Sequence, residues 1–160
     1  MMRKLGVAAA VVVALAVSGY AQKKPDFSGS WTVDTEKSDP AQGPGAGPAG
    51  GGRGPGGMMG PLTIKQTAGS ISIESQGRQG MQTRTYKLDG SEQEITFGQM
   101  KAKAKAKWDG DKIVIETTRE GRDGTPFTTS VTYSLNADGT LTALNKTPMG
   151  ERKVVYKKTT

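Results

Sequence analysis

The sequence predicts an all-β protein in which an antiparallel up-and-down meander closes into a barrel of about eight to ten strands. The first observation is a series of short segments in which apolar and polar residues alternate, as in half-buried strands. The second is the Gly-containing turns between these segments, four of them Asp-Gly pairs. Asp-Gly suits tight hairpins because they need positive φ. Closure removes the exposed edges of an open sheet, and a two-sheet sandwich is the alternative.

Residues 1–21 have the pattern of a cleavable secretory signal peptide. Two basic residues precede an apolar run, and Gly19 and Ala21 form a small-x-small cleavage site. The run has about 13 residues, fewer than the roughly 20 that a transmembrane helix needs. We therefore expect cleavage after Ala21 and a mature periplasmic or secreted protein with a single domain at 22–160.

The mature chain contains ten candidate strands and one long interruption. The strands are expected at residues 29–35, 62–67, 70–76, 82–88, 93–97, 100–108, 112–119, 127–135, 140–146 and 152–157. Residues 39–61 are almost entirely Gly, Pro and Ala. Such a stretch buries too little apolar surface to offset its ordering entropy, so we expect a disordered loop. The loop is either a tolerated insertion or a functional segment, namely a flexible lid or an adhesive tail.

Alanine and lysine alternate most regularly in residues 100–108. Both residue types favour helix, but a helix would distribute the lysines around its circumference, whereas a strand places them all on one face. We therefore predict a strand, with its alanines turned inward. The outward face carries Lys101, Lys103, Lys105 and Lys107. This cationic face is either simply solvated or docks on an anionic envelope surface.

The first strand opens with Phe27-Ser28-Gly29-Ser30-Trp31, and its Gly-x-Trp resembles the opening signature of the calycins, the lipocalin and fatty-acid-binding families. Residues 108–115, 138–142 and 154–158 resemble the last strands of a fatty-acid-binding barrel. The resemblance implies a barrel around a small-molecule cavity. It also implies that Trp31 closes the barrel base beneath a cation from a late strand, Arg152 or Lys157. Alternatively, Trp31 is simply a large core residue.

Two departures favour the broad calycin family over a named member. Fatty-acid-binding proteins hold the ligand carboxylate with Arg-x-Tyr on the last strand, but here Val154 lies two residues before Tyr156. Either Arg152, which has the same parity as Tyr156, partly substitutes, or the ligand carries no acid group. The helical lid of that family is also missing, and the Gly-rich stretch takes its place.

We expect an exported lipocalin-like protein that binds or carries a small hydrophobic ligand without transforming it. The predicted pocket residues, chosen because their parity turns them inward, are Phe97, Met100, Ala102, Ala104, Ile113, Ile115, Tyr133 and Tyr156. The sequence has no His and no Cys, which removes the Ser-His-Asp and Cys-His nucleophile arrangements and the usual zinc ligand sets. We therefore expect that the protein is not an enzyme and that it holds no metal or cofactor. Export argues against nucleic acid as a partner. The alternative is a structural or cell-envelope interaction module that uses the cationic strand face.

Overall fold

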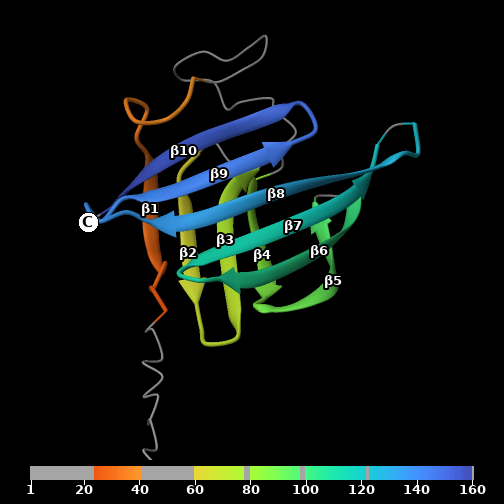
Figure 1. The fold of residues 1–160 in the computed structure, drawn as a ribbon, viewed down its shortest axis with the longest axis horizontal. Coiled ribbons are helices and arrows are strands. Elements are labelled where there is room, and N and C mark those ends of the chain that lie inside the picture. Colours follow the sequence, from red (N-terminus) through yellow and green to blue (C-terminus); the bar gives the residue numbers. More distant parts are fainter. Residues whose placement is uncertain (1–23, 41–59, 78–79, 98–99, 122, 160) are drawn as a thin grey trace, which may run out of the picture.

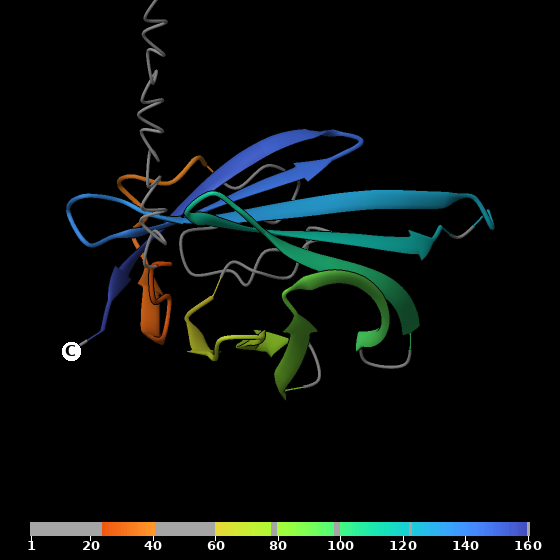
Figure 2. The same cartoon turned by 60° about the horizontal axis from the view of Figure 1, so that its bottom comes forward.

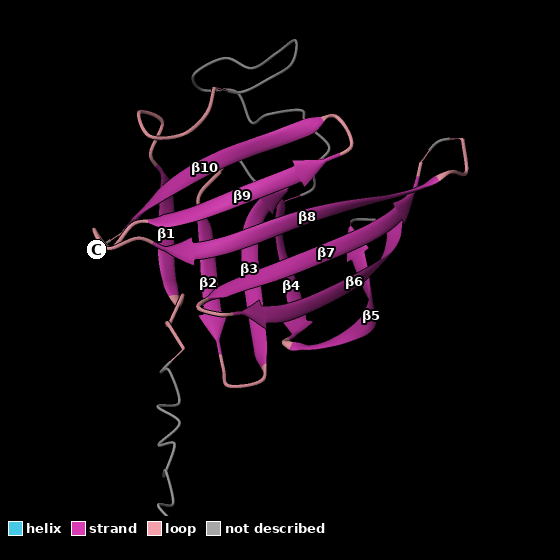
Figure 3. Ribbon diagram, viewed as in Figure 1, coloured by secondary structure: helices cyan, strands magenta, loops and turns pink. Residues whose placement is uncertain are grey.

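The computed structural model describes residues 24–40, 60–77, 80–97, 100–121 and 123–159. Every regular element in these ranges is a strand (Figure 3). The strands are β1 (Gly29–Val33), β2 (Leu62–Gln66), β3 (Ser70–Gly77), β4 (Gly80–Lys87), β5 (Asp89–Phe97), β6 (Met100–Asp109), β7 (Lys112–Glu120), β8 (Pro126–Leu135), β9 (Leu141–Thr147) and β10 (Gly150–Lys158). The predicted signal peptide and most of the predicted loop at 39–61 lie outside the described residues. No helix that could cross a bilayer is present in the described ranges.

The strands form a single antiparallel sheet that follows the order of the chain. Its strand order is β4-β3-β2-β1-β10-β9-β8-β7-β6-β5. The first and last strands pair, with Trp31 opposite Lys158 and Val33 opposite Tyr156. Figure 1 shows β1 beside β10 at this join. The predicted meander and its closure between the two ends of the chain are therefore confirmed.

The continuous sheet curls until β2, β3 and β4 lie opposite β7, β8 and β9 (Figure 2). Strands β4 and β5 are its two edges. The Gln93 side chain links them, because its oxygen accepts from the Lys87 N–H at 2.9 Å and its amide donates to the Thr85 carbonyl at 2.7 Å. The barrel is thus nearly closed, and it is one sheet rather than a sandwich of two.

Strand β6 confirms that residues 100–108 are extended. Ala102, Ala104 and Ala106 are buried, while the four lysines between and beside them are exposed. The strand is paired on both sides, to β5 and to β7. Hydrogen bonding to two neighbours and burial of one face outweigh the helix propensity of alanine and lysine.

Strand β5 begins four residues earlier than predicted. Asp89 pairs with Lys107 and Glu92 pairs with Lys105, with a bulge between the two pairs. Gly90 has a φ of 78°, which lets the chain reverse directly out of β4. A bulge adds a residue without ending the strand, so the turn residues themselves belong to the ladder.

Candidate ligand-binding site

The inner wall of the barrel brings most of the predicted pocket residues into one buried cluster. Its members from the prediction are Ala102, Ala104, Ile113, Ile115, Tyr133 and Tyr156. They come from four strands, and Ile113 lies directly opposite Tyr133 across β7 and β8. The wall is therefore apolar and carries small side chains on β6 and large ones on β8 and β10. Contact of these residues with a ligand stays a prediction.

One predicted pocket residue, Met100, differs from its predicted position, and another, Phe97, is not tested. Met100 is 58% exposed, so its predicted inward position is wrong. Parity alone placed it inside, but it is the first residue of β6 and lies at the end of the barrel, where burial is lost. The side chain of Phe97 lies outside the described residues, although its backbone pairs with Met100.

A polar cluster lies within this apolar interior, and Arg84 on β4 is its cation. Arg84 is 8% exposed and its Nη2 donates to the Ser75 Oγ on β3 at 2.8 Å. Tyr86, two residues along β4, is buried on the same face. Tyr133 from β8 and Tyr156 from β10 are also fully buried. Burial of a charge is costly, so an interior arginine needs hydrogen-bonding or charged partners, which come from the site itself or from a ligand.

The three tyrosines influence one another and the nearby arginines electrostatically. Burial raises the pKa of Tyr86, and the charge and hydrogen bonding of Arg84 oppose the rise. Burial also raises the pKa of Tyr133, which Tyr156 and Tyr86 raise further. The pKa of Tyr156 is likewise raised by burial and lowered in part by Arg152. All three phenols therefore stay neutral well above physiological pH, and the buried Arg84 guanidinium acts on two of them, Tyr86 and Tyr133.

Sequence reasoning missed Arg84 and Tyr86. The Arg-x-Tyr spacing that is absent from the last strand occurs on β4 as Arg84-Thr85-Tyr86. The alternation in the predicted strand 82–88 already puts Arg84, Tyr86 and Leu88 on one face. Because Tyr86 and Leu88 are apolar or aromatic, that face was the better candidate for the interior.

The base of the barrel is closed by Trp31, but the cation over it is Lys158. The Lys158 Nζ lies 5.6 Å from the centre of the Trp31 ring. Arg152, the predicted partner, instead donates to the Asp39 carbonyl at 3.1 Å. Lys157, the alternative, pairs with Asp34 at 3.1 Å. The register explains the correction, because Trp31 is opposite Lys158 and so shares a face with it.

The segment before β1 packs against the same end of the barrel. Phe27 is fully buried, and its ring centre lies 6.0 Å from that of Trp108. Its backbone N–H donates to the Gln66 Oε1 at 3.0 Å, and its carbonyl accepts from the Trp31 Nε1 at 3.0 Å. Lys24 lies over the Trp108 ring at 4.5 Å. Aromatic rings and hydrogen bonds thus seal this end.

The lysine face of β6 is largely compensated by acids on the neighbouring strand. Lys101 pairs with Glu94 at 3.0 Å, and Glu92 pairs with Lys103 at 3.0 Å and with Lys105 at 3.6 Å. These pairs reduce the positive potential that the sequence pattern predicted. Docking to an anionic surface through Lys101, Lys103, Lys105 and Lys107 stays a prediction.

A shallow hollow of about 550 Å³ lies on the outer wall, around the turn between β8 and β9. Its lining is mostly polar and includes the ion pair between Lys37 and Asp138 at 3.0 Å. This chemistry does not suit an apolar ligand. The described ranges contain no group of three or more acidic residues that could hold a metal ion.

The described strands form a nearly closed antiparallel barrel of ten strands, with the tryptophan of the Gly-x-Trp buried at one end. The resemblance seen in the sequence is therefore confirmed for the fold. Among solved structures the chain is similar to human cRBP IV, with a TM-score of 0.62 and 19% identity over 85% of this chain and 100% of that one. It is also similar to the REP1-NXSQ fatty acid transporter, with a TM-score of 0.59 and 20% identity over 83% and 96% of the two chains. No protein-family model matches the chain, and no curated protein matches it.

Proposed function

We propose that the protein is an exported, non-catalytic carrier that holds a small hydrophobic ligand inside the barrel. The observation that carries this proposal is the inner wall, which is apolar over β6, β7 and β8 and contains Arg84 beside buried phenols. A ligand with an apolar body and an acidic head fits both parts, because a guanidinium and phenol O–H groups donate to an anion. The description of one structural neighbour as a fatty acid transporter supports the same ligand class.

The non-catalytic part rests on the chemistry of the residues present. The sequence offers no His or Cys as a base or nucleophile. Asp34 is a buried acid, but it has a structural partner in Lys157 at 3.1 Å. Burial acts to raise the pKa of Asp34, and hydrogen bonds from Lys157 and from the backbone of Glu36 outweigh it, so the pKa is lowered. Asp34 therefore stays ionised and locked at the closure of β1 and β10.

The interior site is tested by titrating the purified protein with a long-chain fatty acid and with the alcohol of equal chain length. Arg84→Met keeps the length of the side chain and removes its charge. Loss of a charged hydrogen bond is worth about 1.5–3 kcal/mol, so affinity for the acid should fall about 10- to 100-fold. Affinity for the alcohol should change far less, because it has no charge for Arg84 to recognise.

The matched control is Arg119→Met, an arginine at the end of β7 whose guanidinium lies 4.7 Å from the centre of the Phe127 ring. This variant should bind the fatty acid like the wild type. Failure of both the acid and the alcohol to bind the wild-type protein would contradict the carrier function. Equal loss in the two arginine variants would contradict the role of Arg84.

Export is tested separately by recovering the protein from cells that produce the full chain. Mass spectrometry of the exported fraction should give a chain that begins at Gln22, because Gly19 and Ala21 form the predicted cleavage site. A full-length chain retained inside the cell would contradict this part of the proposal and leave the binding test unaffected.

A further inference from the structure

Three exposed methionines lie on three different hairpins. Met81 is 57%, Met100 58% and Met149 89% exposed, and they are the exposed large hydrophobic side chains among the described residues. Met81 follows the β3–β4 turn, Met100 follows the β5–β6 turn, and Met149 lies in the β9–β10 turn. Successive hairpins of a meander open at alternate ends, so these three turns lie at one end of the barrel.

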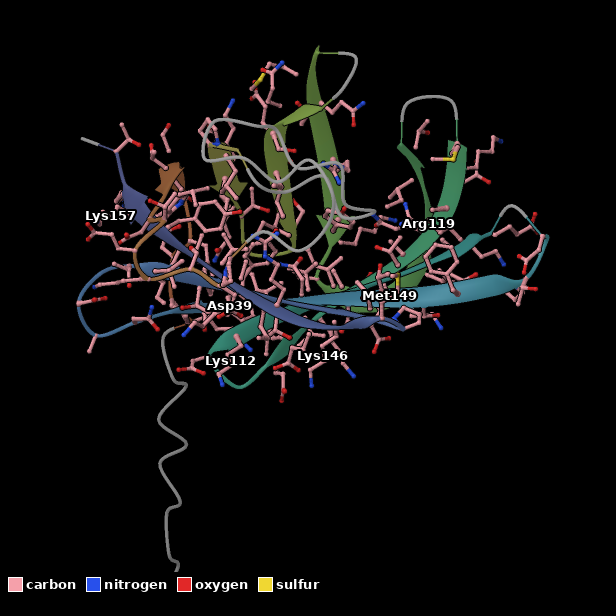
Figure 4. All side chains as sticks on the ribbon, turned by 90° about the horizontal axis from the view of Figure 1, so that it is seen from above. Asp39, Lys112, Arg119, Lys146, Met149 and Lys157 are labelled. Atoms are coloured by element: carbon pink, nitrogen blue, oxygen red, sulfur yellow. The ribbon has the colours of Figure 1, made fainter. Side chains whose placement is uncertain are left out.

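The opposite end has no such side chain in the part of the chain that the structure describes. The aromatic residues there are covered, since Trp31 and Phe27 are buried and Trp108 is half-buried against the core. Figure 4 separates the two ends, with Met149 and Arg119 on one side of the molecule and Lys112 and Lys157 on the other. Among the described residues, the exposed large apolar side chains are therefore concentrated at a single end.

Two of these methionines, Met100 and Met149, lie beside lysines that are paired with acids. Lys101, which follows Met100, pairs with Glu94 at 3.0 Å. Lys146, in the hairpin of Met149, pairs with Glu151 at 3.1 Å. These two lysines already have acidic partners and gain little from anionic headgroups. Their pairing favours contact with a surface that is itself electrically neutral.

We propose that this methionine rim, defined as Met81, Met100 and Met149, docks the barrel on a zwitterionic phospholipid surface. A stable protein partner needs about 20 to 30 residues a side, whereas the rim consists of three separate tips. A lipid surface deforms around separate tips and takes each side chain into the boundary between headgroups and acyl chains. The unbranched methionine side chain adapts to such an irregular environment. The inference goes beyond the proposed carrier function, because docking does not require an occupied interior.

The test uses protein purified from the exported fraction without residues 1–21, so that the apolar leader cannot bind lipid. Partitioning into phosphatidylcholine vesicles is measured by sedimentation, at low and at high salt. The wild type should partition, with little dependence on salt. Full burial of a methionine is worth about 1.5–3 kcal/mol, so replacing all three by glutamine should lower the partition coefficient about 100-fold even with partial insertion.

The matched control replaces the same three residues by leucine, which keeps the rim apolar and should preserve partitioning. Circular dichroism checks that both variants are folded, and fatty acid titration checks whether the interior site is intact. Unchanged partitioning of the glutamine variant would overturn the proposal. Binding only to anionic vesicles at low salt would also overturn it, as would a dimer in sedimentation equilibrium that the glutamine variant abolishes.

Discussion

Truncation of Phe27 to alanine tests whether the segment before β1 seals the barrel base. The ring is fully buried and packs on Trp108, and Gln66 holds its backbone N–H at 3.0 Å. Removal of a buried phenylalanine side chain costs about 3–5 kcal/mol. For a chain of this size we expect the Tm to fall by about 10–20 °C. The assay is urea and thermal unfolding followed by tryptophan fluorescence.

Fluorescence is informative here because the two tryptophans of the sequence, Trp31 and Trp108, both lie at this end. In the folded variant their emission should shift to longer wavelength, since the removed ring shields them from water. The matched control is Phe127→Ala, at the other end of β7 and β8 and half-buried, which should cost less than about 1.5 kcal/mol. Equal losses in the two variants, with unchanged emission, would refute the sealing role of the segment.

Three further perturbations have definite expected results. Residues 22–160 contain three tyrosines, Tyr86, Tyr133 and Tyr156, and the pKa of each is raised in the folded protein. The stability that their neutral phenols contribute is therefore complete below about pH 10 and is lost at higher pH, so tyrosinate absorbance should appear only with unfolding. A titration step near pH 10 in the native protein would contradict the burial of these three phenols. Gly29→Ala should cost about 1–3 kcal/mol in chemical unfolding, because Gly29 has a φ of 141°, which a residue with a Cβ adopts only under strain. A Cβ there would lie 2.7 Å from the Lys158 Cε, and the flexible lysine side chain can move aside. Gly69→Ala, which has no positive φ and open space around it, should cost much less. Gln93→Leu should lose about 1 kcal/mol and speed amide exchange of Lys87, since two hydrogen bonds across the β4–β5 edges disappear; unchanged exchange would contradict the bridging role.

The strands were predictable because each one leaves a local pattern. The Asp-Gly turns mark the hairpins, and the strict alternation around Ala104 outweighs helix propensity once a strand has neighbours on both sides. The Gly-x-Trp placed Trp31 at the barrel base. Period-two alternation and turn chemistry lie within a few residues of one another, so a single sequence reveals them.

The details of the site depend on pairings between distant strands, which local patterns do not determine. The pairing of β1 with β10 places Lys158, and not its neighbour Lys157, opposite Trp31. Adjacent residues of a strand point to opposite faces, so a difference of one residue decides which lysine lies over the tryptophan. Arg84 was missed because a charged residue is rarely assigned to an interior. Met100 was misplaced because parity does not say where a strand leaves the barrel.

The interior site itself is tested most directly by NMR of the protein with a bound long-chain fatty acid. The barrel account predicts nuclear Overhauser contacts from the ligand chain to the methyl groups of Ala104 and Ile115. It also predicts a shift of the ligand carboxylate resonance that disappears in Arg84→Met. Contacts confined to the outer wall, or a carboxylate that does not respond to Arg84, would contradict it.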